Sequence, residues 1–497
     1  MTRMAMTLRR RLSTLRSSPR AQRRYAAGAA VVALGLLGWS GGTWAASPPA
    51  GAPWPQMVAQ PGTATISVPY PTVGQSEALT AQGLPKRTAV RLVWQTVQGQ
   101  WQVDGPTFIG AAYRYGTTVL ARAVTTAQGM MHVRFAVPQG FGGTHLLGLE
   151  LGSGKMAAET SVTVIPSVTL TSSRVPEGGF FQFTMTGIGY QPYFALFPVT
   201  YDNHLTGNVT AVTTDGTAHF AVRAVGVGFH EIEINNGVMG GPYLNEQQSP
   251  FPFMPTFAFP VTVLPGTPKN VSNPLPQLHN PASGKLTATP ASGVVGGTLT
   301  LVGQHLAPHH RYTLTWWTMK ASHVSGHGYA PVAVPWGSVT TNAAGAFRVH
   351  ETVPSDLGGP PHRITLSDGS AVVATTFFRI FPKVVAITPN PAPEGSLVTV
   401  TLLGGGWTDY DNSFIGFGCA FSSQGNLQIQ LRATGKPGLH FIDLYPSIWK
   451  GQDTLPNYYL VPQLTYNADH PGDWLPAFHL VLRVTAPRPA HSATRRA

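Results

Sequence analysis

A set of short motifs that recurs after about 216 residues constrains the fold of this 497-residue chain more than any other feature. Val137-Pro138 returns as Val353-Pro354, displaced by 216 positions, and Pro176-Glu177-Gly178 returns as Pro393-Glu394-Gly395, displaced by 217. A fixed internal displacement is the signature of a repeated structural unit. The two motif sets alternate along the chain, which predicts a two-domain block that occurs twice, in the order A-B-A′-B′.

The residues between these motifs have the texture of β-strands. Short runs such as Phe229–Ile234 and Val398–Leu402 alternate apolar and polar side chains, and turn residues recur roughly every 8–12 positions. No stretch after residue 46 keeps a helical period with caps. Each unit has about 100 residues, the size of an immunoglobulin-type sandwich. The expected fold class is therefore all-β, with four tandem β-sandwiches after an N-terminal signal or anchor helix.

The motif positions set the expected boundaries. They are residues 1–46 for a signal peptide or membrane anchor, 47–64 for a Pro/Ala/Gly-rich spacer, 65–166 for unit A, 167–265 for unit B, 266–284 for a linker, 285–383 for unit A′, 384–485 for unit B′ and 486–497 for a basic tail.

The start of the chain has the composition of an export signal. Residues 1–24 contain eight arginines and no acid, an apolar run follows from Tyr25 to Trp39, and small residues come next. Thr43 and Ala45 would be the −3 and −1 positions of a cleavage site. If it is not cleaved, the segment 25–46 is long enough to anchor the chain in a membrane, with the arginines in the cytoplasm. Both alternatives predict an exported, extracellular or cell-surface protein.

The net charge of +12 invites a nucleic-acid-binding role, but its distribution argues against one. The first 24 residues hold +8 and the tail holds +3, so the body carries only +1. Only 10% of the residues are charged, so few ion pairs are available to lose when carboxylates protonate, and we expect comparative insensitivity to acid. A single cysteine, Cys419, excludes an intramolecular disulfide, so each sandwich must rest on hydrophobic packing.

The turn motifs resemble those of bacterial extracellular immunoglobulin-like repeats. Residues 388–396 (TPNPAPEGS), followed by an alternating strand and Gly404-Gly405-Gly406-Trp407, resemble the opening of an IPT/TIG-type domain. Residues 289–303 are similar. The resemblance implies an immunoglobulin-like fold and a surface location, and it carries no catalytic residues onto this chain.

Motifs of enzyme chemistry are incomplete, or, like the G-x-S-x-G match at Gly38–Gly42, lie inside the predicted export signal. No GxGxxG is present, and Gly152-Ser153-Gly154-Lys155 lacks the first glycine and the hydroxyl residue of a phosphate-binding loop. His230-Glu231 lacks the second histidine of a zinc-protease helix. We therefore expect a protein that is not an enzyme and needs no cofactor.

Two places offer weak metal-ligand candidates. Asp409 and Asp411 have the spacing of the first half of a calcium loop, but its central glycine and closing glutamate are missing. His309 and His310 belong to a histidine-rich stretch of unit A′. A polar loop and solvated histidines are the simpler interpretations.

Tryptophans divide into core and surface candidates. Trp94 and Trp316 match across the repeat and are expected in the core. Four others lie nearer to loops and are candidates for a ligand-binding aromatic surface: Trp317, Trp336, Trp407 and Trp449.

The function that these features favour is surface attachment or envelope assembly by a non-catalytic exported protein, with recognition through loops or strand edges. The alternative is a glycan-binding or hydrolase-accessory set of modules, and a third hypothesis is a metal enzyme built on the A′ histidines. The expected partner is a surface or envelope protein or a glycan. We expect no nucleic acid, and contact with a membrane only through residues 25–46 if they are not cleaved.

Overall fold

The computed structural model describes most of the chain after residue 53. The described residues are 54–104, 107–191, 193–238, 241–249, 251–273, 284–320, 330–406, 412–415, 418–420, 424–449, 459–460, 462–472 and 474–487. These residues all belong to one compact unit, Ala50–Ala497. The predicted signal or anchor at 1–46 and residues 488–497 of the predicted basic tail lie outside the described residues. Among these residues no helix is long and apolar enough to cross a membrane.

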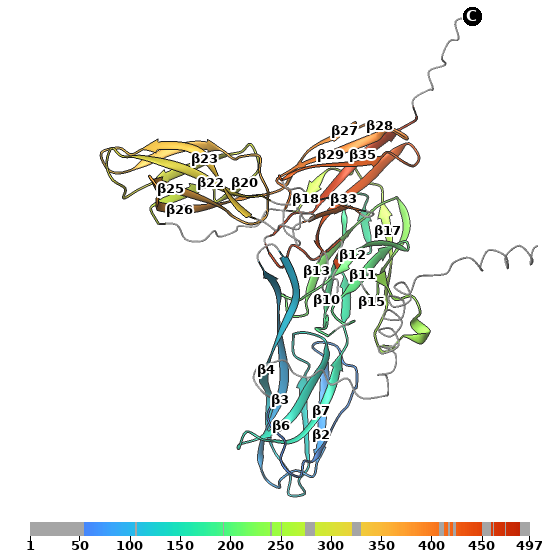
Figure 1. Cartoon of the computed structure of the whole chain (residues 1–497). Helices are drawn as coiled ribbons and strands as arrows, with labels where there is room; N and C mark the ends of the chain where they lie inside the picture. Colours follow the sequence, from blue (N-terminus) through green and yellow to red (C-terminus); the bar gives the residue numbers. More distant parts are fainter. Residues whose placement is uncertain are drawn as a thin grey trace, which may run out of the picture. The chain divides into compact units, whose positions relative to one another are not determined.

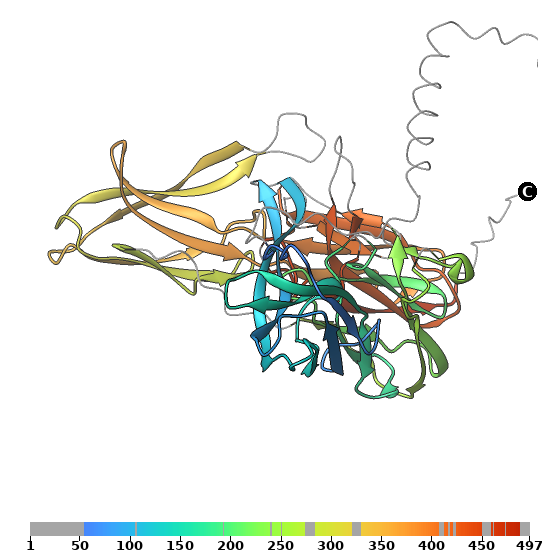
Figure 2. The same cartoon turned by 90° about the horizontal axis from the view of Figure 1, so that it is seen from below.

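The described strands form four pairs of β-sheets and one further two-stranded sheet, and each pair is closed over its own hydrophobic core (Figure 1; Figure 2). This confirms an all-β chain with multiple β-sheet domains. We call the four sheet pairs modules A, B, A′ and B′ in chain order. The helical element of the described residues is one 3-10 turn, η1 (Glu246–Gln248).

Module A pairs a three-stranded sheet, β1-β2-β5, with a four-stranded sheet, β4-β3-β6-β7. Alternate side chains of both sheets enter the core, where Leu79, Leu92 and Leu147 are fully buried. Trp94 is 3% exposed and its counterpart Trp316 in module A′ is 1% exposed, which confirms both as core residues. The strands are β1 (Thr63–Ile66), β2 (Ser76–Gln82), β3 (Ala89–Asp104), β4 (Thr107–Val124), β5 (Met131–Ala136), β6 (Gly143–Leu151) and β7 (Met156–Val164).

Module B pairs the sheet β13-β10-β8 with the sheet β12-β11-β14-β17-β9, in which β9 joins β17 in parallel. A small sheet, β15-β16, accompanies it. The strands are β8 (Ser167–Leu170), β9 (Arg174–Pro176), β10 (Phe180–Thr186), β11 (Phe197–Tyr201), β12 (His204–Val209), β13 (Ala218–Arg223), β14 (Gly228–Ile234), β15 (Gly237–Val238), β16 (Gly241–Pro242) and β17 (Phe257–Leu264).

Module A′ also pairs a three-stranded sheet, β19-β21-β24, with a larger sheet, β20-β26-β25-β22-β23. In the larger sheet β20 joins β26 in parallel. The strands are β19 (Leu286–Thr289), β20 (Ser292–Gly293), β21 (Thr298–Gly303), β22 (Arg311–Lys320), β23 (Ala330–Thr340), β24 (Phe347–Thr352), β25 (His362–Asp368) and β26 (Ala371–Ile380).

Module B′ consists of the sheet β27-β29-β32 and the sheet β18-β35-β33-β30-β31, with β28 on β35 and β34 on β33. The residues are β18 (Val271–Ser272), β27 (Lys383–Thr388), β28 (Ala392–Pro393), β29 (Leu397–Leu403), β30 (Asn412–Ile415), β31 (Gly418–Ala420), β32 (Asn426–Arg432), β33 (Gly438–Trp449), β34 (Tyr459–Leu460) and β35 (Phe478–Thr485). β18 lies inside the predicted linker 266–284. That segment is therefore more than a spacer, because it adds an edge strand to the B′ sheet through pairing with β35.

The junction between A and B is built like the junction between A′ and B′. The Gly142 N–H donates to the Ile188 carbonyl and the Gly358 N–H to the Gly405 carbonyl, both at 2.9 Å. A Cβ atom on Gly142 would lie 1.9 Å from the Gly187 carbonyl oxygen. The backbones approach so closely that only glycine fits, which accounts for the recurrence of the Gly-Gly motif.

Candidate functional site

A buried carboxylate joins three modules. Asp469, which is 1% exposed, accepts a hydrogen bond from Trp101 Nε1 of module A at 2.7 Å. From module B it accepts Thr210 Oγ1 at 2.6 Å and the backbone N–H groups of Val212 and Thr213 at 2.9 Å. The Thr213 hydroxyl donates to it as well, at 2.9 Å. Hydrogen bonds of this kind compensate a buried charge for the loss of water, so Asp469 fixes the position of A and B against B′.

Apolar packing surrounds this carboxylate. Phe108 of β4 lies in one buried cluster with Ile448, Tyr466 and Leu475 of module B′, and Trp101 packs against the cluster. The end of the long β3–β4 hairpin of module A thus reaches the core at the B–B′ contact. The motifs of the sequence give no sign of this contact, and the available signal is the length of the two strands, which exceeds the usual length of a sandwich strand.

A second buried polar group links B directly to B′. Arg223 of β13 is 2% exposed, and its guanidinium donates to Asp443 Oδ1 at 2.9 Å and to the Leu480 carbonyl at 3.0 Å. The same Asp443 oxygen lies 2.8 Å from His479 Nδ1. The guanidinium also lies over the ring of Phe441, 4.5 Å from its centre. Arg223 therefore neutralises the carboxylate of Asp443 inside the contact.

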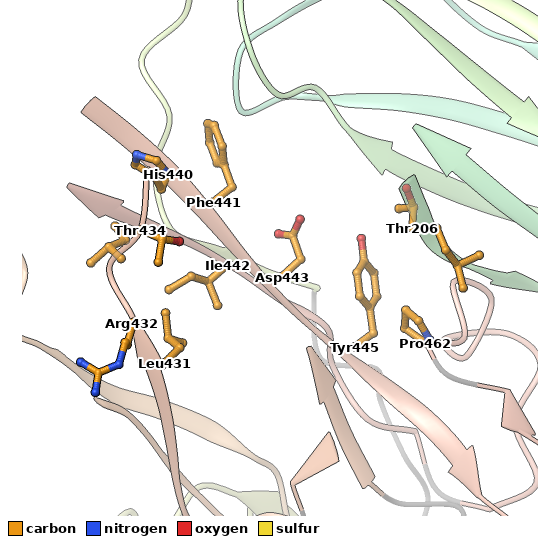
Figure 3. Close-up of a pocket in the computed structure, with 12 residues that line it drawn as sticks. Thr206, Leu431, Arg432, Thr434, His440, Phe441, Ile442, Asp443, Tyr445 and Pro462 are labelled. Atoms are coloured by element: carbon orange, nitrogen blue, oxygen red, sulfur yellow. The ribbon is translucent and has the colours of Figure 1, made fainter. Parts of the chain in front are cut away.

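A groove of about 510 Å³ lies beside this ion pair (Figure 3). Figure 3 shows Phe441, Asp443 and Tyr445 projecting from one side of β33, with Thr206 of module B opposite Tyr445. The volume is typical of a small-ligand or peptide site. The groove is lined by Leu205, Thr206, Leu431, Arg432, Thr434, His440, Phe441, Ile442, Asp443, Tyr445, Pro462 and Leu482.

The groove follows an uncovered strand edge. Among the described residues, β33 pairs with β30 only between Tyr445 and Ser447. The chain turns back directly afterwards, because Ile415 of β30 pairs with Gly418 of β31. The segment Gly438–Leu444 pairs with β35 on one side and with no described strand on the other. Unpaired main-chain groups at such an edge are ready to bind an added strand.

Tyr445 contributes an unused donor to the groove. Its hydroxyl is buried and has no hydrogen-bond partner among the described residues. Burial raises the pKa of Tyr445 well above its usual value; the charge of Asp443 adds to the shift and Arg223 opposes it. The hydroxyl is therefore a neutral donor, and a buried donor without an acceptor costs free energy that a ligand oxygen would recover.

The predicted aromatic sites are dispersed in the structure. Trp317 is half-buried on β22, where its Nε1 donates to Thr365 Oγ1 at 3.0 Å and Arg363 lies 4.1 Å over its ring. Trp336 is half-buried on β23 and packs edge-on against Trp316 at 5.1 Å. Trp407 lies outside the described residues. Trp449 ends β33, but its side chain lies outside the described part of the chain.

The predicted metal ligands form no cluster where the structure describes them. His309 is exposed, and His310 Nε2 lies 3.0 Å from Asp368 Oδ2. Asp409 and Asp411 lie outside the described residues. Across the described ranges, no three His, Cys, Asp or Glu residues are placed to hold a metal ion.

No protein-family model matches the chain, and no curated protein is significantly similar to it. Similar solved structures include alpha-2-macroglobulin of Salmonella, at 9% identity and a TM-score of 0.19, over 86% of this chain and 31% of that chain. The ICAM-5 D1–D4 ectodomain fragment has 12% identity and a TM-score of 0.18, over 86% of this chain and 100% of that one. A putative membrane anchored protein from Corynebacterium diphtheriae has 11% identity and a TM-score of 0.17, over 64% of this chain and 91% of that one.

The chain thus spans less than a third of the length of the Salmonella protein. All three likenesses are to multi-domain β-sandwich proteins. TM-scores this low support no inference about function, which has to come from the groove itself.

Proposed function

We propose that this chain is an exported, non-catalytic surface or envelope protein that acts in adhesion or assembly, and that it binds its partner in the groove between modules B and B′. The observation that carries the proposal is the edge of β33 between Gly438 and Leu444, which no described strand covers, next to the Tyr445 hydroxyl, which has no described partner. A strand edge recognises protein main chain, which favours a protein partner over a glycan.

Two further features support a binding role. The buried Asp469 and Arg223 hold modules A, B and B′ together around the groove, so a partner would meet a preorganised surface. The A-B-A′-B′ order, with IPT/TIG-type modules, accounts for both the repeated junction glycines and the repeated motifs. The arginine-rich start followed by an apolar run would deliver these modules to the cell exterior.

The first experiment tests whether the chain is exported. A C-terminal epitope tag on the full chain, followed through fractionation of the source cells, is expected in the envelope or the medium. Protease added to intact cells is expected to remove the tag signal while a cytoplasmic marker survives. A tag signal that stays with the cytoplasmic marker would contradict export.

A further inference from the structure

The strand of module B that corresponds to β33 is β14, and its edge is covered by a neighbouring strand where the edge of β33 is open. Strand β14 of B corresponds to β33 of B′: Gly228 pairs with Val263 and Gly438 with Val484 at the same end of each ladder. His230 therefore corresponds to His440. Each ring donates from Nε2 to a carbonyl four residues earlier, at 2.7 Å to Gly226 and at 2.8 Å to Lys436.

In module B the chain itself covers this edge. Strand β11 pairs with β14 as far as Tyr201 opposite Ile232. The next residue, Asp202, lies in the β11–β12 turn with a left-handed backbone (φ 49°). It donates its N–H to the Glu231 carbonyl at 2.9 Å and accepts the Glu231 N–H on its carboxylate at 3.0 Å. The other carboxylate oxygen lies 2.6 Å from His230 Nδ1.

The pKa of Asp202 shows that this contact is favourable to its charged form. Desolvation raises the pKa of Asp202. Hydrogen bonds from His230 and the Glu231 N–H lower it, as does the electrostatic attraction of His230 and His204, and together they hold the pKa below its usual value. The aromatic residue before it contributes as well, because the Tyr201 ring packs 5.0 Å from His230 and its hydroxyl donates to the Val225 carbonyl at 2.8 Å.

In module B′ the matching groups have no partner among the described residues. Phe441 corresponds to Glu231, so the alternation of an antiparallel ladder directs its N–H and C=O outward to the open edge. Within the described part of the chain, His440 Nδ1 and the Thr434 carbonyl have no hydrogen bond. Thr434 is the counterpart of Val225, because it follows Ala433 as Val225 follows Ala224, and these two alanines make matching hydrogen bonds to Ser396 and Gly179. His440, Phe441 and Thr434 line the groove together (Figure 3).

We propose that the groove binds, in trans, a peptide whose extended strand ends in an aromatic residue and is followed by an acidic residue at a turn, in the way that β11 and the turn after it present Tyr201 and Asp202 to module B. The strand pairs with the outward groups of β33. Its carboxylate accepts hydrogen bonds from His440 Nδ1 and the Phe441 N–H, and its aromatic hydroxyl donates to the Thr434 carbonyl.

Charge at the groove agrees with this occupant. Lys436 is exposed four residues before His440, and Arg432, which also lines the groove, is exposed with its guanidinium donating to the Gly395 carbonyl at 3.0 Å. The groove's own acid, Asp443, is already neutralised by Arg223 at 2.9 Å. An acidic side chain therefore meets basic neighbours at this end of the groove and no free carboxylate.

This peptide site rests on the proposed function, in which the chain binds a protein partner. Its test uses the purified full chain, so the result does not depend on whether the chain is exported. The probe is a fluorescent synthetic peptide with the sequence of residues 196–203 (LFPVTYDN), followed by anisotropy. We expect saturable binding, weakened about tenfold by His440→Ala in the protein or by Asp202→Asn in the peptide, since each removes a charge-assisted hydrogen bond. His230→Ala is the matched control, because its ring already has a partner within module B, and it is expected to leave the affinity unchanged.

A second probe needs no protein variant. Methylation of the peptide N–H of Asp202 removes the donor for the Phe441 carbonyl, and it is expected to weaken binding about tenfold or more. Absence of saturable binding, or equal affinities for the wild-type chain and His440→Ala, would overturn the proposal. Dimers in sedimentation that His440→Ala dissociates would also overturn it, because the occupant would then be a second copy of this chain.

Discussion

His362 in module A′ faces backbone carbonyls with both ring nitrogens, as His145 does in module A, and its Nδ1 also lies 3.7 Å from Asp356 Oδ2. Both rings are almost fully buried, and each stacks on a tryptophan, at 4.8 Å for His145 and 4.5 Å for His362. Each ring nitrogen faces one backbone carbonyl, at 2.7–3.0 Å. The four carbonyls belong to Gln95, Phe141, Trp317 and Leu357. The repeat therefore preserves a buried polar arrangement as well as a hydrophobic core.

Acid is expected to destabilise module A through His145. Burial lowers the pKa of His145 and outweighs its backbone hydrogen bonds, which raise it. In the unfolded chain the ring titrates near 6.5, so below that pH the unfolded state binds more protons and the free energy of unfolding falls until the pH reaches the folded pKa. His145→Gln, which cannot gain this charge, is expected to lower Tm at pH 7.5 but to flatten the decline of Tm toward pH 5.

The matched control for this measurement is His132→Gln, because His132 is exposed on β5 and bonds only to Thr80. It is expected to leave the slope unchanged. Parallel pH profiles for the wild-type chain and His145→Gln would show that His145 does not cause the decline. The scarcity of carboxylates would then be the better guide to acid tolerance.

Replacement of Asp469 by Asn is expected to lower the free energy of unfolding by about 2–4 kcal/mol. The amide has one acceptor oxygen where the carboxylate has two, and its NH₂ group would face the donors that now bind Asp469. Urea unfolding followed by tryptophan fluorescence measures the change. Asp368→Asn, at a carboxylate 53% exposed, is the control and is expected to change stability by less than about 1 kcal/mol. Equal effects of the two substitutions would contradict the role given to Asp469.

Arg223→Met is expected to cost about 2 kcal/mol, because it leaves Asp443, whose side chain is only 23% exposed, with His479 as its remaining charged partner. Arg91→Met removes an ion pair of similar length, 2.8 Å, but Arg91 is 38% exposed, so the expected cost is below about 1 kcal/mol. Differential scanning calorimetry measures both. A double variant, Arg223→Met with Asp443→Leu, is expected to recover part of the loss, and no recovery would argue against the ion pair as the cause.

Gly358→Ala is expected to destabilise the A′–B′ junction by about 2 kcal/mol or more, since the added Cβ would lie 2.0 Å from the Gly404 carbonyl oxygen. Gly152→Ala meets no atom within 4 Å and is the control. Limited proteolysis between A′ and B′ measures the loosening. Equal protease resistance in both variants would contradict a role for the glycine in close approach.

The sequence was sufficient to predict the all-β class and the buried places of Trp94 and Trp316, because period-two strands and repeated motifs are local signals. It was not sufficient for the candidate site. Asp469 lies far from Trp101 and Thr210 in the chain, and a single aspartate in a loop carries no sign of its distant donors. The unusual length of strands β3 and β4 was the feature that could have indicated a contact beyond module A.

The sequence motifs also do not reveal the open edge of β33, because modules B and B′ differ in how far the neighbouring strand extends. His230 and His440 follow the same glycine-led motif in sequence. In the described part of the chain an aspartate lies beside His230, supplied by the turn after β11, and none lies beside His440. The distinction arises where β30 turns back at Ile415, and such strand lengths follow from tertiary pairing rather than from local preference. Aromatic residues near loops were a weaker guide, because Trp317 and Trp336 pack against their own module.

The central claim is that an exported chain binds a partner strand at the edge of β33, and photo-crosslinking in the source cells tests it most directly. A photoreactive residue is placed at Leu439, 36% exposed on this edge, or at its module B counterpart Phe229, 71% exposed. We expect Leu439 to give a crosslinked partner outside the cytoplasm, which is lost with His440→Ala, and Phe229 to give none. Equal crosslinking from the two positions, or adducts confined to the cytoplasm, would contradict it.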